Sequence, residues 1–236
     1  MLNKQLIRNF NATTGYFREV NKLDTASIGH SDILPGDISD YYNKMGVTLG
    51  VLFDNSTPLF NPSKGWIFAA NAKYSGFGNS THHFLKMLAE VRNYRLVGSV
   101  VFAWKVKYGI SFSYDEDGVI PVDERFFAGG SSSVRGWQRS YLGPIGDDIP
   151  LGGKSFFETG MESRIPVIEK LHGVIFMDAG NVWQETGAFR LNELRYAAGA
   201  GIRVDTPIGP IRFDLARPVW DVQNKWQWHL SVGHAF

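Results

Sequence analysis

The sequence contains no cysteine among its 236 residues. Disulfide bonds, thiolate metal sites and a cysteine nucleophile are therefore excluded, and the absence fits an oxidising compartment, where a free thiol is a liability. A basic excess is also missing, because 24 Lys and Arg stand against 23 Asp and Glu. Composition thus shows no basic face of the kind that binds nucleic acid, and we expect no nucleic-acid partner.

Long apolar runs are absent as well. No stretch approaches the roughly 18 consecutive apolar residues that a membrane-spanning helix requires. A chain of this kind can cross a bilayer only as a closed β-barrel, which satisfies every backbone hydrogen bond within the protein. The N-terminal segment MLNKQLIR lacks the apolar core of a signal peptide. We therefore expect an exported protein in mature or truncated form.

Two kinds of reactive site find no support in the sequence. No Ser/His/Asp set stands in a recognisable catalytic motif, so we expect no enzyme activity. His82 and His83 are adjacent but have no third ligand at a metal-binding spacing. We interpret them as a solvated strand end and expect neither a metal nor another cofactor.

Strand formers and turn formers dominate the composition. Apolar residues make up 44% of the chain, aromatic residues 14%, and glycine occurs 26 times. This mixture favours β-structure. Between residues 99 and 110 the apolar residues recur at every second position, whereas Lys105 and Lys107 lie on the opposite face. Such a period of two indicates a strand with one apolar face.

About ten segments show this alternation. They are residues 16–23, 45–54, 66–75, 85–92, 99–110, 154–165, 171–183, 195–205, 211–215 and 226–236. A soluble sandwich or a lipocalin-like barrel alternates in the same way. Two features favour a membrane barrel: Trp and Tyr stand at strand ends, and the polar faces carry more charge than a small dry core tolerates. The residues expected to face lipid are Phe68, Trp104, Val106, Met161, Ile202, Phe213 and Leu230.

One connection between the expected strands is much longer than the others. Gly209 and Pro210 turn one strand into the next almost at once, whereas residues 113–153 form a connection of about forty residues. A connection of this length without secondary structure of its own is normally functional in a compact barrel.

The long connection contains the segment FFAGGSSSVRGW, residues 126–137. Its Gly-Gly-x-x-x-Val-Arg-Gly-aromatic pattern resembles the loop signature of the BamA/TamA outer-membrane assembly-factor superfamily, which includes two-partner secretion transporters and organellar sorting barrels. Residues 160–166, 174–183 and 206–216 are similar to the family's following strands. The resemblance covers roughly residues 45–236, and it departs from the family at Asn55 and Ser56.

The resemblance implies an all-β fold, an antiparallel transmembrane β-barrel. About 10 to 12 strands are expected in this chain, as the C-terminal part of a family barrel of about 16 strands. Residues 1–236 are expected to form one barrel region without periplasmic modules, with residues 113–153 as the motif-bearing loop. Whether the chain is an excised part or a naturally short relative stays open.

Arg135 is the central candidate residue of the loop motif. A guanidinium inside a barrel needs a carboxylate partner, and Glu162 and Asp178 are inward-facing acids that match the family positions receiving this arginine. We expect a water-filled lumen around these groups. The alternative is a solvated loop arginine. The full motif comprises Gly129, Gly130, Val134, Arg135, Gly136 and Trp137.

The last expected strand carries a second set of candidate residues. Its apolar face and its C-terminal end match the outer-membrane targeting signal, with His234 as an interfacial substitution. The resemblance further implies a weak seam at this strand, where free backbone groups template a client strand. Gly233 is consistent with weakened pairing. The set comprises Trp228, Leu230, Val232, Gly233 and Phe236.

The function implied by the resemblance is non-enzymatic. A family member assists the insertion or secretion of client proteins at the outer membrane of a Gram-negative bacterium, with an organelle outer membrane as the other location. The partners implied are outer-membrane lipid, client proteins and periplasmic or lipoprotein components. The competing functions are a two-partner-type secretion channel and a passive outer-membrane pore.

Overall fold

The structure is a computed structural model that describes residues 2–7, 9–22, 41–59, 61–207, 209–221 and 225–233, with the backbone alone for 2–7. Its main element is one antiparallel sheet of 11 strands, joined in sequence order from β1 at one edge to β13 at the other. The strands are β1 (Leu2–Ile7), β2 (Phe10–Lys22), β3 (Tyr41–Asp54), β4 (Gly65–Ser75), β5 (Phe84–Val97), β6 (Val100–Ser113), β9 (Ser155–Ile168), β10 (Leu171–Trp183), β11 (Arg195–Val204), β12 (Ile211–Val219) and β13 (Gln227–Val232).

The remaining elements are small. Within the long connection after β6 lie the 3-10 turn η2 (Val122–Glu124) and a hairpin of β7 (Ile145–Gly146) and β8 (Ile149–Pro150). A second 3-10 turn, η3 (Leu191–Glu193), precedes β11. No helix among the described residues is long and apolar enough to cross a membrane. The prediction of an all-β antiparallel fold with about 10 to 12 strands is confirmed.

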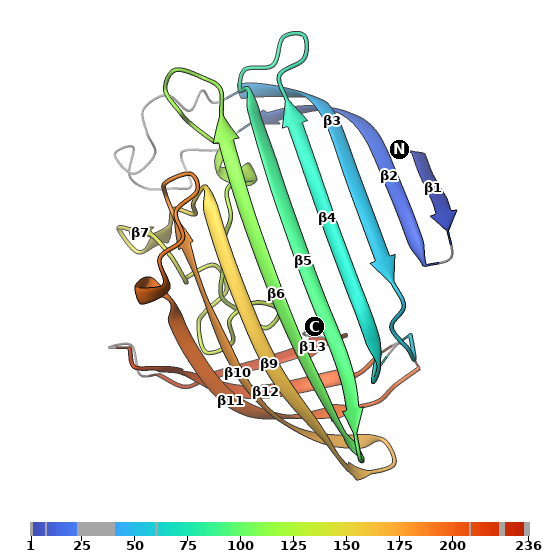
Figure 1. Ribbon diagram of the computed structural model, residues 1–236. Helices are drawn as coiled ribbons and strands as arrows, with labels where there is room; N and C mark the ends of the chain where they lie inside the picture. Colours follow the sequence, from blue (N-terminus) through green and yellow to red (C-terminus); the bar gives the residue numbers. More distant parts are fainter. Residues whose placement is uncertain are drawn as a thin grey trace.

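The sheet is strongly curved, and the long connection lies on its concave side (Figure 1). The curvature is large enough to bring distant strands together. Asn61, in the turn between β3 and β4, donates a hydrogen bond of 3.2 Å to Asp205, which follows β11. Arg164 of β9 donates to Asn61 and to the carbonyl of Pro62. The concave side is therefore a lumen bounded by both halves of the sheet.

Several boundaries differ from the sequence-based expectation, among them those at both ends of the sheet. At the N-terminus, β1 was not expected, and β2 begins at Phe10 rather than near residue 16. The segment from Asn11 to Thr14 has no continuous apolar face, and it forms a strand because it pairs with β1 and β3. At the C-terminus, β13 ends at Val232, because Gly233 turns away with a φ of +96°. Residues His234 and Phe236 lie outside the described residues.

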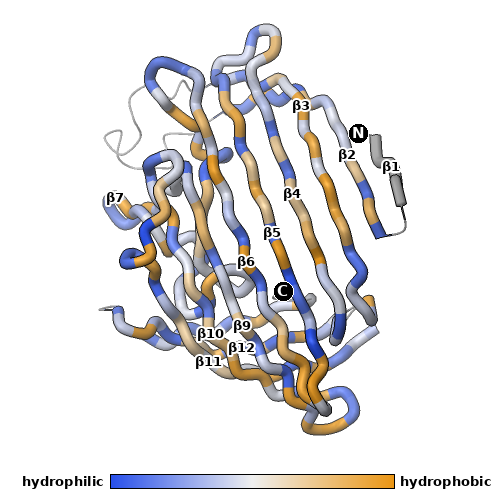
Figure 2. The backbone as a smooth tube through the Cα atoms, viewed as in Figure 1, coloured by the Kyte–Doolittle hydropathy of each residue, from blue (hydrophilic) through white to orange (hydrophobic). Residues whose placement is uncertain are grey.

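The two faces of the strands differ in burial as the alternation predicts. In β12 the exposed residues Ile211, Phe213 and Leu215 alternate with the buried residues Arg212 and Asp214. Hydrophobic residues recur along the strands of the sheet (Figure 2). All seven residues expected to face lipid lie on the outer side of their strands. Charge thus faces the lumen and apolar surface faces outward, as in a membrane barrel.

The long connection contributes the main apolar core of the lumen. Its residues Phe126, Ala128, Val134, Trp137 and Leu142 are buried against the barrel wall. Their wall partners are Phe156, Val182 and Ala197. The connection is therefore a packed insert, and its backbone is fixed to the wall by isolated bridges such as that between Phe126 and Gly153.

Neighbouring residues at the centre of β4 provide a test of which face meets lipid. Ala70 lies on the outer side and Asn71 on the lumenal side at nearly the same depth. We expect Ala70→Arg to lower the free energy of unfolding in lipid vesicles by about 2 to 4 kcal/mol, because the charge enters hydrocarbon. Asn71→Arg should change it by no more than about 0.5 kcal/mol. Equal destabilisation in urea titrations of the two variants would contradict the assigned orientation.

Candidate functional site

The loop motif is shaped by glycines in conformations that other residues rarely adopt. Gly136, next to Arg135, has a φ of +100°. A Cβ at Gly136 would lie 2.9 Å from the Cβ of Ala197 and 3.0 Å from the backbone carbonyl carbon of Arg217. Close approach to β11 and β12 therefore requires a glycine at this position. Gly129 and Gly130 have φ values of +101° and +102°, and Gly130 N–H donates to the Trp137 carbonyl at 3.1 Å.

The two large apolar residues of the motif flank the arginine in sequence and are both buried. Val134 is 0% exposed and Trp137 is 3% exposed, and both belong to the apolar core of the lumen. The guanidinium of Arg195 lies 5.2 Å from the centre of the Trp137 ring. This packing removes apolar surface from water, which stabilises the docked loop independently of the ion pairs.

Arg135 forms a bidentate contact with Asp178 of β10. Its Nε donates to Oδ2 at 2.7 Å and its Nη2 donates to Oδ1 at 2.9 Å, while the Arg135 backbone N–H donates to Oδ2 at 3.0 Å. Its Nη1 donates to Oε2 of Glu162, on β9, at 2.7 Å. The guanidinium also stacks on the Phe176 ring, 3.4 Å from the ring centre. The expected contacts with both acids are thus present, and the alternative of a solvated arginine is excluded.

Further charges surround this contact and balance it. Glu162 also accepts from Arg164 Nε at 2.9 Å and from Arg203 Nη2 at 3.1 Å. Arg203 Nη1 donates to Asp214 of β12 at 2.6 Å. Asp214 Oδ2 lies 3.7 Å from Arg135 Nη1. Three arginines therefore face three carboxylates on β9 to β12 and the loop, and the motif arginine lies among all three acids.

The expectation of a water-filled lumen around Arg135 is wrong. The side chains of Arg135, Glu162 and Asp178 are each 1% exposed. The loop residues on both sides of Arg135 are equally dry, because Val134 and Trp137 are buried in the apolar core of the lumen. An acid that lost its partner at this place would be left in a dry environment, where an unpaired charge is strongly destabilising.

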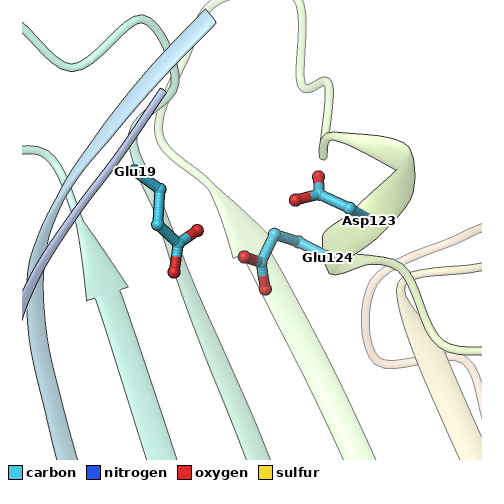
Figure 3. Close-up of side chains that lie close together, drawn as sticks. All are labelled: Glu19, Asp123 and Glu124. Atoms are coloured by element: carbon cyan, nitrogen blue, oxygen red, sulfur yellow. The ribbon is translucent and has the colours of Figure 1, made fainter. Parts of the chain in front are cut away.

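Sequence reasoning missed a second group of charges that binds the loop. Lys44 of β3 contacts the carboxylates of Glu19, Asp123 and Glu124, which lie close together (Figure 3). Burial raises the pKa of the Asp123 carboxyl, but hydrogen bonds from Lys44 and Tyr42 outweigh this and hold the pKa below its ordinary value. The stabilisation that Asp123 contributes to folding is therefore fully present above the ordinary pKa of an aspartate. It is lost as the pH falls through the lowered pKa of Asp123 in the folded protein.

A signal for this group exists in the sequence. Lys44 and Lys73 both lie on the lumen-facing side of their strands. The adjacent acids Asp123 and Glu124 lie in the long connection. The motif also has an unexpected contact of its own: Ser133 Oγ donates to Glu158 at 2.5 Å, and Glu158 pairs with Lys105 at 3.1 Å. Pairing these groups required knowledge of how the loop folds back.

The residues expected at the last strand lie apart from this centre. Trp228, Leu230 and Val232 are 70%, 66% and 62% exposed and lie on the outer side of β13. Gly233 follows the strand, and its N–H donates to the Pro210 carbonyl at 2.9 Å, so it is not an unpaired strand residue. Phe236 lies outside the described residues. The role of these residues stays a prediction.

A family model and curated relatives both match this chain, and they agree with each other. The model of the Omp85 superfamily domain matches residues 8–236. The outer membrane protein assembly factor BamA of Neisseria meningitidis serogroup B is 26% identical over 67% of this chain and 24% of its own length. The chloroplastic outer envelope protein 80 of Arabidopsis thaliana is 32% identical over 47% of this chain and 15% of its own length.

A solved structure supports the fold. The crystal structure of BamA from Haemophilus ducreyi lacking POTRA domains 1–3 superposes with a TM-score of 0.74 at 18% identity. It covers 97% of this chain, and the chain covers 52% of that structure. The chain thus spans about a quarter of the curated BamA relative and about half of this solved chain.

The Arg135 contacts predict a specific pattern of destabilisation. Arg135→Ala leaves Asp178 without the guanidinium, and we expect the free energy of unfolding to fall by about 3 to 5 kcal/mol. The ladder of the sheet is untouched, so heat-modifiable migration on gels should persist. Asp178→Asn in the alanine background removes the orphaned charge and should restore part of the loss. Arg135→Lys should restore little, because lysine cannot reproduce the bidentate contact. An alanine variant with wild-type unfolding and wild-type tryptic cleavage after Arg139 would refute this assignment.

A second prediction separates backbone fit from charge. Gly136→Ala keeps every charge but places a methyl group against Ala197 and Arg217. We expect the motif to undock, with cleavage after Arg139 accelerated about as much as in Arg135→Ala. Gly98→Ala is the control, because Gly98 has a φ of +61° and no atom within 4 Å of an added Cβ. Equal cleavage patterns for the two alanine variants would mean that close approach at Gly136 does not hold the loop.

Proposed function

Because the chain belongs to the Omp85 superfamily, we propose that it is the barrel segment of an outer-membrane assembly factor, which helps client proteins to insert into or cross the membrane. The observation that carries the proposal is the docked loop. Its motif arginine is buried between acids of β9 and β10, and the adjacent Gly136 packs on β11 and β12. The proposed site is therefore a positioned insert, with no part in bond-making chemistry.

The insert acts by fixing the shape of the wall. Arg135 joins β9 and β10, and its motif neighbour Gly136 lies against the backbone of β12. A loop held in this way keeps the C-terminal strands in one arrangement relative to one another. The strand that follows them, β13, is the proposed meeting point with a client.

The edge strand β13 offers a template for a client strand. Among the described residues β13 pairs with β12 alone, through residues Ile211 to Ala216. Free backbone groups at such an edge accept a further strand by β-augmentation. An added strand with apolar residues outward would continue the surface formed by Trp228, Leu230 and Val232. The protein and its client would thus present one continuous apolar face to the lipid.

Location and partners follow from the same proposal. The outward apolar face requires membrane lipid as a partner, and an outer-membrane location is supported by the names of the relatives, an outer membrane protein assembly factor and an outer envelope protein. We assign the chain to the outer membrane of a Gram-negative bacterium. Outer-membrane or secreted proteins are the clients, and periplasmic or lipoprotein components are the accessory partners.

A two-partner-type secretion channel is the second candidate, because it shares the Val-Arg-Gly loop. A passive pore is less well supported, since the loop fills part of the lumen with a buried apolar core. The two transport-related functions differ in their clients. An assembly factor controls the folding of many membrane barrels, whereas a secretion channel serves a particular exoprotein.

The test replaces the gene by its Arg135→Ala variant in the native host. We expect a folded variant protein at the membrane, together with a severalfold fall in heat-modifiable client barrels. Arg190→Ala is the control, because Arg190 is an exposed turn arginine paired with Glu185 and Glu193. If depletion of the protein leaves client barrels intact but stops the release of one large exoprotein, the secretion channel replaces the assembly factor.

A further inference from the structure

The long loop is held at a second place, away from its motif. The acids Asp123 and Glu124 of η2 lie on the loop, and they meet Glu19 of β2 on the inner side of the N-terminal strands (Figure 3). Arg135, further along the same loop, is bound to β9 and β10. We call the contacts of η2 the η2 anchor and those of Arg135 the motif anchor.

Lys44 is the centre of the η2 anchor. Its side chain is 1% exposed, and its ammonium lies 2.6 Å from Glu124 and 2.9 Å from Glu19. The same ammonium donates to Asp123, which also accepts a hydrogen bond of 2.8 Å from the Tyr42 hydroxyl. An ammonium group has three N–H donors, and Lys44 has three carboxylate partners, two on the loop and one on β2.

Two further lysines complete the η2 anchor. Lys73 Nζ donates to Glu124 at 2.5 Å and lies 3.3 Å from Glu19, and Lys86 Nζ lies 3.5 Å from Glu124. Three ammonium groups from β3, β4 and β5 thus neutralise three carboxylates. The acids are occupied by lysine, so the role of the cluster is attachment of η2 to the wall.

The two anchors differ in their access to water. In the motif anchor all side chains are 1% exposed or less, including Glu162, Asp178 and Asp214. In the η2 anchor Lys44 and Glu124 are buried, at 1% and 6% exposed, but Glu19 and Asp123 are 40% and 42% exposed, and Lys73 and Lys86 are 21% and 24% exposed. Exposed pairs are screened by salt, whereas buried pairs are screened far less. Added salt therefore weakens the half-exposed pairs of the η2 anchor, those of Glu19 and Asp123, before it weakens the motif anchor.

We propose that the η2 anchor is the releasable end of the loop and that Lys44 is the positioning residue that holds it. On release, η2 leaves β2 to β5 while the motif anchor and the bridge between Phe126 and Gly153 stay in place, so the loop opens only as far as Arg125. The two halves of the sheet are then no longer joined through residues 124–135. The consequence for client handling rests on the proposed function, whereas the consequence for loop position does not.

The chain contains its own reporters for this movement. Arg125 follows η2 directly and is tied to the carbonyls of Ile120 and Leu151, so cleavage after it by trypsin reports release of η2. Arg135 reports the motif anchor in the same digest. Proteolysis through a rapid opening step follows the population of the open form.

The experiment compares tryptic cleavage of the full-length protein in lipid vesicles at low and high NaCl. We expect Lys44→Met to accelerate cleavage after Arg125 on the order of tenfold at low salt, with Arg135 still protected. Asp123→Asn, at a half-exposed position that cannot disrupt the sheet, should act in the same direction. Lys44→Arg should keep most of the protection, and salt should accelerate the wild type but not Lys44→Met.

The control is Lys107→Met, which removes another lumenal lysine, one that lies over the Phe156 ring and not near η2. The proposal is overturned if Lys44→Met and Asp123→Asn both leave cleavage after Arg125 within about twofold of the wild type. It is equally overturned if Lys107→Met matches them, or if salt exposes Arg135 before Arg125. A complementation assay separates the release of η2 from the proposed function. If Lys44→Met exposes Arg125 to trypsin and still supports normal client assembly, the η2 anchor has no role in function. Full complementation by Arg135→Ala would count against the proposed function instead.

Discussion

The buried contact of Arg135 with Asp178 and Glu162 is the interaction on which the lumenal structure depends. A guanidinium that is 1% exposed is tolerable only because two carboxylates and the face of Phe176 replace its lost water. The contact fixes where the loop returns to the wall, and the apolar packing of Val134 and Trp137 follows from that position. Charge pairing and apolar burial therefore support the same docked state.

The bilayer imposes the complementary constraint on the outer surface. Residues such as Met161 and Phe213 stay exposed to the surroundings of the protein because lipid, rather than a protein core, is the medium that covers them. The strands consequently send their charges inward, where arginines and lysines pair with acids. A lumen built from matched charges can hold a loop firmly at one place and loosely at another, depending on how much water reaches each pair.

Sequence reasoning located much of this arrangement and failed at identifiable points. The resemblance of the Val-Arg-Gly motif, together with the inward-facing positions of Glu162 and Asp178, predicted the contact of Arg135. The dry surroundings of that contact were not predicted, because the loop that excludes water is itself the long connection, whose fold leaves no periodic signal. The Lys44 cluster was missed for the same reason: β2, β3 and η2 are distant in sequence, and only the returning loop brings Glu19, Lys44 and Asp123 together.

The sequence by itself determined an all-β chain and the two faces of each strand, because a period of two is a local property of the chain, and the resemblance of its loop motif pointed to Arg135 as the tether. The tertiary structure alone decided where strands begin and end, as at β1 and Gly233, since those limits depend on pairing with neighbours and on turn geometry. It alone also decided which charges meet and how dry each pair is. Such contacts arise from the curvature of the whole sheet around the loop, a long-range property that no local pattern encodes.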